Sequence, residues 1–512
     1  MTLLKSLRGR SALIGAALAA SALAAGAAGA QDRTTPPERI APLLHDDEAI
    51  VVTHHEVRTS AGVLNYDARA GRLAIRNDET GAVRGYVYFT AYVVPTQNGR
   101  SRPLTILWNG GPSSNSLLLH TEMFGPRRIT ESGMVDNAET LLATSDLVFY
   151  DPVGTGFSRA GNDADREFLT TLGDFAETAE FVRAYRARFA ASRQPLFLAG
   201  ESYGTWRVNG TTEMLTNRGI RVAGAILISG GVPGSLMSAA FQDAMYVPAR
   251  TATAFELRKL PPDLLRNKDA TMAQVNAWIR TTYLPALEHV ETLTRAQRDA
   301  VTVSLARFTG VRPEQIDRKT LVMTNNAYKS GLFEGNRDRM LNTFDMRLQG
   351  SNPAAEAEVP NRVQTLADYF RGELGYRTDL AYTGLEDGYM PTPGPPRRST
   401  GERWDYNHVK ITPEVVARMQ SGGGPPLSQP WLQNAMRKDA GIHVFVAAGR
   451  YDSLNMCEGN LAMSGKLETS LSSRFEHHCY EGGHMMYHVP ASRLRLARDV
   501  ADFVNRVSKT AP

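Results

Sequence analysis

The pentapeptide Gly-Glu-Ser-Tyr-Gly at residues 200–204 constrains the fold of this 512-residue chain more than any other feature. The apolar run 195–199 precedes it, and a predicted helix start follows it. A serine at the apex of so tight a turn has a strained backbone, and the close approach of strand and helix demands glycine two residues on either side. The Ser202 hydroxyl then projects clear of the sheet, and the next backbone N–H can face a developing negative charge. The pattern predicts a nucleophilic serine between a strand and a helix.

Short, almost entirely apolar segments recur on both sides of this serine. They cover residues 104–108, 146–150, 196–199, 223–228 and 442–448. Such runs are typical of strands buried on both faces of a parallel sheet. A helix is predicted at 172–190, where Asp174 near the start and arginines near the end suit the helix dipole. Runs at 71–75 and 85–90 flank a turn signal and are predicted to pair antiparallel.

The stretch 236–400 has a different character. Its amphipathic patterns at 273–283 and 296–308 predict helices, and a proline-rich linker at 391–396 ends it. A second loop of glycines and prolines, 422–426, precedes the last core elements. We therefore predict an α/β core in two parts, 31–235 and 401–512, interrupted by a helical cap insertion.

Residues 1–30 have the pattern of a secretory signal. A basic start is followed by an apolar stretch at 12–27 and by an A-x-A cleavage site that ends at Ala30. The alternative is an uncleaved membrane anchor, but the apolar stretch is short and rich in alanine. We expect cleavage near Ala30 and a periplasmic or secreted mature protein.

The signal also explains most of the net charge. Lys5, Arg8 and Arg10 supply three of the four net positive charges, so the rest of the chain is nearly neutral. Neither nucleic-acid binding nor steering of acidic substrates is predicted. No later stretch approaches the roughly 18 apolar residues of a membrane span, so no membrane association is expected after cleavage. Neither C-x-x-C nor H-E-x-x-H occurs, so we predict no metal and no other cofactor.

A serine nucleophile needs a base to take its proton and a carboxylate to orient that base. In the chain order Ser, Asp, His, both partners follow Ser202. Asp452 lies at the carboxyl end of the predicted strand 442–448, and His484 follows a Gly-Gly turn after the run 474–480. Either residue alone could be an ordinary loop residue. Their order and their places at strand ends favour a catalytic triad.

A tetrahedral intermediate also needs two backbone donors for its oxyanion. Tyr203, directly after the serine, supplies one of them. The sequence Trp-Asn-Gly-Gly-Pro at 108–112 follows the strand predicted at 104–107 and can supply the other, with Gly111 as the favoured donor. Its alternative role is that of a simple turn.

Four segments together resemble the serine carboxypeptidase family of α/β-hydrolases. They are Asn-Gly-Gly-Pro at 109–112, Asp-Pro-Val-Gly-Thr-Gly-Phe-Ser at 151–158, the pentapeptide at 200–204 and Gly-His-Met at 483–485. Order and spacing match over roughly 45–235 and 400–510, whereas the insertion matches only in position and helical character. Segments 124–128 and 481–487 resemble bacterial members in particular.

The resemblance implies an α/β-hydrolase fold and hydrolysis of C-terminal peptide bonds through an acyl-enzyme. Ser202 would attack, His484 would act as general base and then acid, and Asp452 would fix the imidazole tautomer. Asn109 and Glu201 would bind the terminal carboxylate of a peptide substrate with a free C-terminus. Because two bare carboxylates repel, Glu201 can take this role only when a proton is shared.

This chain departs from the family pattern at two positions near the site. Ser113 stands where the family usually has glycine after Gly-Gly-Pro. Met123 stands where a glutamate is usual, and Glu122 is one position out of register. The carboxyl pair that tunes Glu201 in the family is therefore in question.

The chain has only two cysteines, Cys457 and Cys479, which flank the loops of Asp452 and His484. An even count in an exported chain favours one disulfide over two buried thiols. The disulfides typical of eukaryotic family members are absent. A bridge between these two cysteines would brace both triad partners.

Serine carboxypeptidase is thus the first functional hypothesis. The same fold and triad do not fix the leaving group, so a serine esterase, an acyltransferase or another exported serine peptidase are alternatives. An envelope binding protein on this fold is the non-enzyme alternative.

Overall fold

The structure is a computed structural model of the chain. It describes residues 48–95, 101–161, 166–231, 238–333, 339–350, 353–384, 403–408, 412–420 and 430–510. The predicted signal at 1–30, the linker at 391–396 and the loop at 422–426 lie outside these ranges. Within them, no helix has both the length and the apolar character that a membrane crossing requires.

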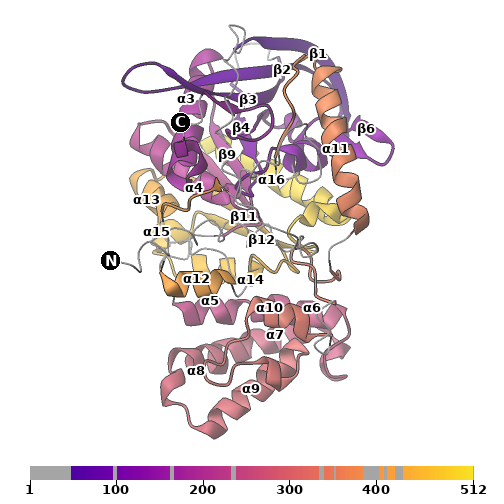
Figure 1. Ribbon diagram of the computed structural model, residues 1–512, viewed down its shortest axis with the longest axis vertical. Helices are drawn as coiled ribbons and strands as arrows, with labels where there is room; N and C mark the ends of the chain where they lie inside the picture. Colours follow the sequence, from indigo (N-terminus) through magenta and orange to yellow (C-terminus); the bar gives the residue numbers. More distant parts are fainter. Residues whose placement is uncertain are drawn as a thin grey trace, which may run out of the picture.

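A ten-stranded sheet forms the centre of the molecule (Figure 1). Three antiparallel strands occupy one side: β1 (Ile50–Thr59), β2 (Gly62–Arg76) and β3 (Val83–Val93). They continue into six strands that run parallel to one another, in the order β7 (Asp146–Tyr150), β4 (Leu104–Trp108), β9 (Leu196–Glu201), β10 (Gly224–Ile228), β11 (His443–Gly449) and β12 (Phe475–Tyr480). The short β8 (Arg159–Ala160) pairs with β3, and β5 (Arg127–Thr130) with β6 (Gly133–Asp136) forms a separate hairpin. The predicted parallel sheet and antiparallel pair are confirmed.

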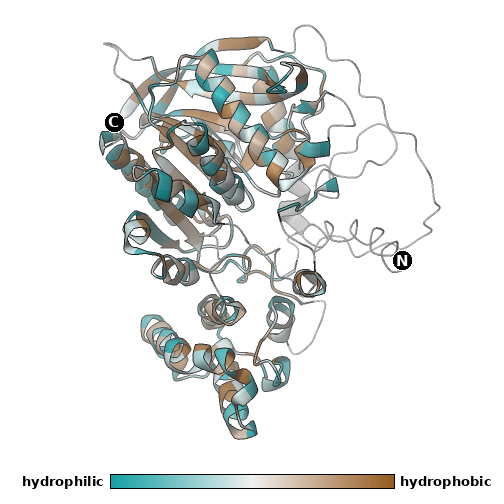
Figure 2. Cartoon of the chain, turned by 90° about the vertical axis from the view of Figure 1, so that its left-hand side faces the viewer, coloured by the Kyte–Doolittle hydropathy of each residue, from teal (hydrophilic) through white to brown (hydrophobic). Residues whose placement is uncertain are grey.

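The parallel strands β4, β7, β9, β10 and β11 are largely apolar because both of their faces are covered, whereas the edge strand β12 is half-buried and carries polar residues. Successive side chains point to opposite faces, so Phe197 and Leu198 of β9 belong to two different hydrophobic clusters and both are fully buried. The helices carry hydrophilic residues on their outer sides (Figure 2). This arrangement follows directly from the apolar runs of the sequence.

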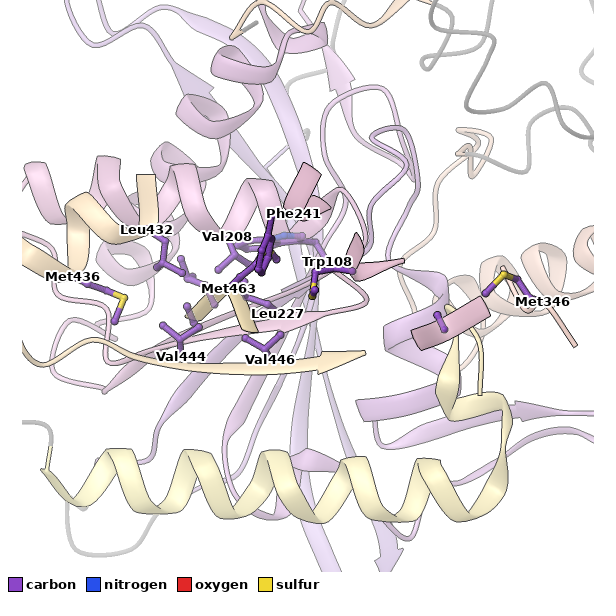
Figure 3. Packing of buried hydrophobic residues seen from close by; sticks show 14 of the residues in the cluster. Trp108, Val208, Leu227, Phe241, Met346, Leu432, Met436, Val444, Val446 and Met463 are labelled. Carbon is purple, nitrogen blue, oxygen red and sulfur yellow. The ribbon is translucent and has the colours of Figure 1, made fainter. Parts of the chain in front are cut away.

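Two helices, one of which begins just after Ser202, cover one face of the sheet. They are α3 (Thr171–Arg188) and α4 (Gly204–Asn217), joined at their edge by α13 (Trp431–Lys438). Val208 of α4 and Leu432 of α13 pack over Leu227 and Val444 of the sheet (Figure 3). The opposite face is covered by α16 (Pro490–Thr510), whose Phe503 contacts Phe197 and Phe445.

Between β10 and β11 the chain forms a helical lobe at the lower end of the molecule (Figure 1). Its helices are α5 (Ala239–Met245), α6 (Val247–Glu256), α7 (Lys268–Trp278), α8 (Leu284–Glu288), α9 (Arg295–Thr309) and α10 (Asn325–Gly331). The next helix, α11 (Pro353–Arg371), instead lies beside β1 and β2 (Figure 1), and its Phe370 packs on Tyr88 of β3. The predicted domain limits at 236 and 400 fall outside the described residues and stay predictions. The remaining helices are α12 (Pro413–Gln420), α14 (Cys457–Ser464) and α15 (Thr469–Ser472).

The packing of α4 on α3 gives a stability prediction. A Cβ at Gly210 of α4 would lie 2.0 Å from a ring carbon of the fully buried Phe175. We expect Gly210→Ala to lower the free energy of unfolding by about 1–3 kcal/mol, because overpacking outweighs the gain in helix propensity. Urea denaturation measures this, with Gly465→Ala as control, since a Cβ there meets nothing closer than 3.6 Å. An unchanged or raised stability of Gly210→Ala would contradict this packing.

Candidate active site

Ser202 sits at the sharp turn between β9 and α4. Its φ of 58° lies in the left-handed region that non-glycine residues rarely adopt. A Cβ at Gly200 would lie 2.2 Å from the carbonyl oxygen of Gly204, so only glycine permits this approach of strand and helix. The Ser202 N–H donates to the carbonyl oxygen of Ile228 in the neighbouring strand, at 2.9 Å. The strained turn is thus fixed to the sheet.

Asp452 and His484 meet at the carboxyl ends of β11 and β12. Their Oδ2 and Nδ1 atoms are 2.7 Å apart, and both side chains are almost completely buried. The Asp452 carboxylate also accepts from the Leu454 N–H at 2.8 Å and from the Asn455 side-chain amide at 3.1 Å. With a carboxylate at Nδ1, the neutral imidazole keeps its proton there and leaves Nε2 as the acceptor.

The charge on His484 is set by two opposing effects. Burial disfavours the imidazolium, whereas the charge and hydrogen bond of Asp452 and the nearby Glu201 favour it, and the pKa of His484 lies above its ordinary value. A transferred proton is therefore stabilised on this ring.

No hydrogen bond joins the Ser202 hydroxyl to His484 in the described part of the chain. The two are linked indirectly, because Ser202 bonds to Ile228 and the next residue, Ser229, donates its hydroxyl to the carbonyl oxygen of His484. Catalytic hydrogen bonds are often long without substrate and shorten in the bound complex. The arrangement is compatible with proton transfer from serine to histidine.

The loop after β4 lies directly against the serine turn. A Cβ at Gly110 would be 2.7 Å from the Tyr203 nitrogen and 2.9 Å from the Ser202 Cβ. Gly111 has a φ of 106°, and a bond from the Ser114 N–H to the Gly110 carbonyl oxygen closes the turn at 3.0 Å. Among the described residues, neither the Gly111 N–H nor the Tyr203 N–H has a hydrogen-bond acceptor. Both N–H groups thus remain available to a substrate oxygen.

Glu201 occupies a polar pocket next to the serine. Its carboxyl group, 2% exposed, accepts from the Asn109 side-chain amide and from the Tyr487 hydroxyl at 2.9 and 3.0 Å. Burial raises the pKa of Glu201 to about 7, although His484 and the Tyr487 hydrogen bond act in the opposite direction. The group is therefore partly protonated at neutral pH and can donate a hydrogen bond.

Glu122 lies on a π-helical turn, Leu119–Phe124. A π turn holds one extra residue compared with an α-helix, and this matches the one-position offset of Glu122 in the sequence. Its carboxylate pairs with Arg362 of α11 and with the His488 ring, whose Nε2 is 2.7 Å away. Glu201 has no bond to Glu122 within the described residues. The acid at this position is thus paired with Arg362 and the His488 ring and not with Glu201.

Residues 70–223 match the family model described as serine carboxypeptidase. The chain is 29% identical over 279 residues to the pheromone-processing carboxypeptidase KEX1 of Eremothecium gossypii, which covers 52% of this chain and 42% of that protein. It is 26% identical over 175 residues to serine carboxypeptidase-like 33 of Arabidopsis thaliana, covering 31% of this chain and 35% of that protein. Residues 70–223 are thus similar to the serine carboxypeptidase family, and the two relatives carry carboxypeptidase names.

The matched segments span well under half the length of these relatives. The solved structure of KEX1(delta)p, a prohormone-processing carboxypeptidase from Saccharomyces cerevisiae, superimposes with a TM-score of 0.51. It covers 87% of this chain and 92% of its own, at 16% identity. This likeness concerns the fold, and the predicted α/β-hydrolase fold is confirmed.

Contacts from the helical insertion were not predicted from the sequence. The carbonyl oxygen of Phe344 accepts from the His484 N–H at 2.5 Å, and the two rings lie 5.4 Å apart. The Thr343 carbonyl oxygen accepts from the Ser453 hydroxyl. This segment therefore lies across both triad loops, and no motif in it signals that position.

Tyr487 was also missed as a site residue. It lies on a 3₁₀ turn, Met486–His488, three residues after His484. Its proximity to the histidine in the sequence is the one signal that could have identified it. No group of three or more His, Cys, Asp or Glu side chains within the described ranges could hold a metal ion.

Cys457, at the start of α14, and Cys479 of β12 form a disulfide in the structure, with Cα atoms 5.7 Å apart. The bond joins the segment after Asp452 to the strand before His484.

Removing this disulfide should lower stability and activity. Its ring spans a sequence separation of 22 residues, so the chain-entropy model gives a loss of about 3 kcal/mol for Cys457→Ser/Cys479→Ser. We expect kcat to fall as well, because both loops lose a common restraint. Thermal melts with and without reductant measure this, and reductant should lower the Tm of the wild type but not that of the variant. A wild type insensitive to reductant would contradict the prediction.

Proposed function

We propose that this chain is an exported serine carboxypeptidase that releases C-terminal residues from peptides through an acyl-enzyme. The observation that supports it most is the buried Glu201 beside the serine turn. A buried carboxyl group with a pKa near 7, held by Asn109 and Tyr487, is suited to receive a second carboxylate. A general esterase has no need of such a group.

The proposed reaction begins with attack of the Ser202 oxygen on the carbonyl carbon of the last peptide bond. His484 Nε2 accepts the hydroxyl proton, and Asp452 stabilises the imidazolium. The oxyanion accepts hydrogen bonds from the N–H groups of Gly111 and Tyr203. Collapse expels the terminal amino acid, whose amine takes the proton from His484. Water then attacks the acyl-enzyme by the same steps.

The proposed substrate contact explains why a free C-terminus would be required. The Asn109 amide and a protonated Glu201 both donate to the substrate carboxylate. An ionised Glu201 would repel it. A C-terminal amide lacks the negative charge that strengthens hydrogen bonds from Asn109 and the protonated Glu201, so it should bind poorly.

Export is part of the proposal. The signal pattern at 1–30 supports it, and the Cys457–Cys479 bond agrees with an oxidising compartment outside the cytosol. The segments 124–128 and 481–487 support a bacterial-type member of the family.

The activity is tested by digesting a peptide library with the mature protein and following the products by mass spectrometry. We expect sequential loss of residues from free C-termini and little cleavage of matched C-terminal amides. In Ser202→Ala, kcat should fall by at least about 10³-fold. Ser473→Ala, in the loop before β12, serves as a serine control. Equal cleavage of acids and amides would favour the esterase or another peptidase. A Ser202 that a serine-directed phosphonate fails to label would favour the binding protein.

The pH dependence follows from Glu201. Below a pH of about 7 the group is protonated and donates to the substrate carboxylate, whereas above it the group is ionised. KM for a free-acid peptide should therefore rise about tenfold per pH unit above neutrality. In Glu201→Gln, which keeps a neutral donor, KM should stay flat from pH 6 to 9. In both proteins kcat should fall at low pH as His484 becomes protonated. A flat KM in the wild type would contradict the assignment.

A further inference from the structure

A completely buried ion pair lies behind the serine turn. Arg207, in the first turns of α4, is 0% exposed, and its Nε is 2.8 and 3.0 Å from the two carboxylate oxygens of Asp174 in α3. The triad and the carboxylate pocket do not include this pair. A buried pair is not by itself a source of stability, since the loss of hydration offsets much of the attraction between the charges.

The rest of the guanidinium is directed at the loop after β4. Its Nη1 donates to the Asn109 carbonyl oxygen at 2.9 Å, and its Nη2 donates to the Pro112 carbonyl oxygen at 3.3 Å. These two carbonyls flank Gly110 and Gly111. Glycine has more backbone freedom than any other residue, so a Gly-Gly turn needs external restraint to hold one geometry. Arg207 holds both ends of this turn.

The same ion pair also contacts Tyr203. The Tyr203 hydroxyl donates to Asp174 Oδ2 at 3.2 Å, and the Arg207 guanidinium lies 5.5 Å from the centre of the Tyr203 ring. Gly111 and Tyr203 are the two proposed oxyanion donors, and neither N–H group has an acceptor among the described residues. One buried charge pair thus restrains the two segments that carry both groups.

We propose that Arg207, anchored by Asp174, is a positioning residue that sets the geometry of the oxyanion hole. The inference rests on the proposed serine hydrolase mechanism. A planar fork with five donors can bind a carboxylate and two separate carbonyls together. Lysine, with a single ammonium, cannot reproduce that geometry. The effect should appear in transition-state stabilisation and not in substrate binding, because the oxyanion forms only during the reaction.

The test compares Arg207→Lys with the wild type on a free-acid peptide and on an activated ester. We expect kcat to fall about 10²–10³-fold on both substrates, the size typical of a lost oxyanion donor, with KM changed less than about threefold. The affinity for a peptide boronate, which forms a tetrahedral adduct with the serine, should fall in parallel with kcat. The rise of KM with pH that Glu201 causes should be unchanged. Asp174→Asn, which keeps the side-chain volume, should show the same pattern with a smaller loss.

Arg250→Met is the matched control. Arg250 of α6 is also buried and donates to the Met323 carbonyl oxygen at 2.8 Å, but it lies in the helical lobe. The Arg250→Met substitution should lower Tm and leave kcat within about twofold of the wild type. The inference is overturned if the Arg207 and Asp174 variants lose no more kcat than Arg250→Met, or if the loss is in KM alone. An active wild type with unaffected variants contradicts this inference alone, whereas a wild type inert to peptide, ester and phosphonate contradicts the proposed function as well.

Discussion

The close approach of three backbone segments is the constraint on which the candidate site depends. Gly200 brings β9 against the start of α4, and Gly204 and Gly110 bring this turn and the loop after β4 together. None of the three positions has room for a Cβ, because each would meet backbone atoms at 2.2–2.8 Å. Trp108 and Gly200 are also register partners in the sheet. The relative positions of the serine, the two free N–H groups and Glu201 are therefore inherited from the pairing of β4 with β9.

The buried ion pair of Asp174 and Arg207 also restrains the segments around the serine turn. Asp174 lies on α3, Arg207 on α4 and their carbonyl partners in the β4 loop, so the pair holds together three elements that the sheet alone does not fix. A neighbouring acid, Glu177, binds the Tyr150 hydroxyl at 2.7 Å, and burial raises its pKa to about 8. Asp174, Arg207 and Tyr150 under the site thus each have a polar partner, as most buried polar groups do.

The sequence predicted those parts of the molecule that local patterns encode. Apolar runs such as 196–199 specify buried strands, and Gly-x-Ser-x-Gly specifies the turn, because both follow from short-range sterics. The strand ends then bring Asp452 and His484 together, as their order along the chain had indicated. Phe344 and Tyr487 could not be found in this way. Their contacts depend on how the insertion folds back over the sheet, and that is decided by packing between residues distant in the sequence.

The surroundings of Glu122 also could not be predicted from the sequence. Its one-position offset indicated a lost carboxyl partner, and the sequence could not reveal the π turn that accommodates the extra residue or the Arg362 and His488 side chains that bind the acid. The consequence is electrostatic. With Glu122 paired to Arg362 and His488, the proton that Glu201 needs must be retained through burial instead of through repulsion by a second carboxylate.

The titrations of Glu201 and His484 are coupled, because each charge favours the ionised form of the other. The state with a protonated Glu201 and a neutral His484 can bind a carboxylate and also accept the serine proton. The state with an ionised Glu201 and a charged His484 holds the same number of protons and can do neither, and each charge stabilises the other. A substrate carboxylate in the proposed site beside Glu201 would oppose ionisation of that group, because like charges repel. In the proposed reaction, the substrate would therefore itself select the protonation state that cleaves it.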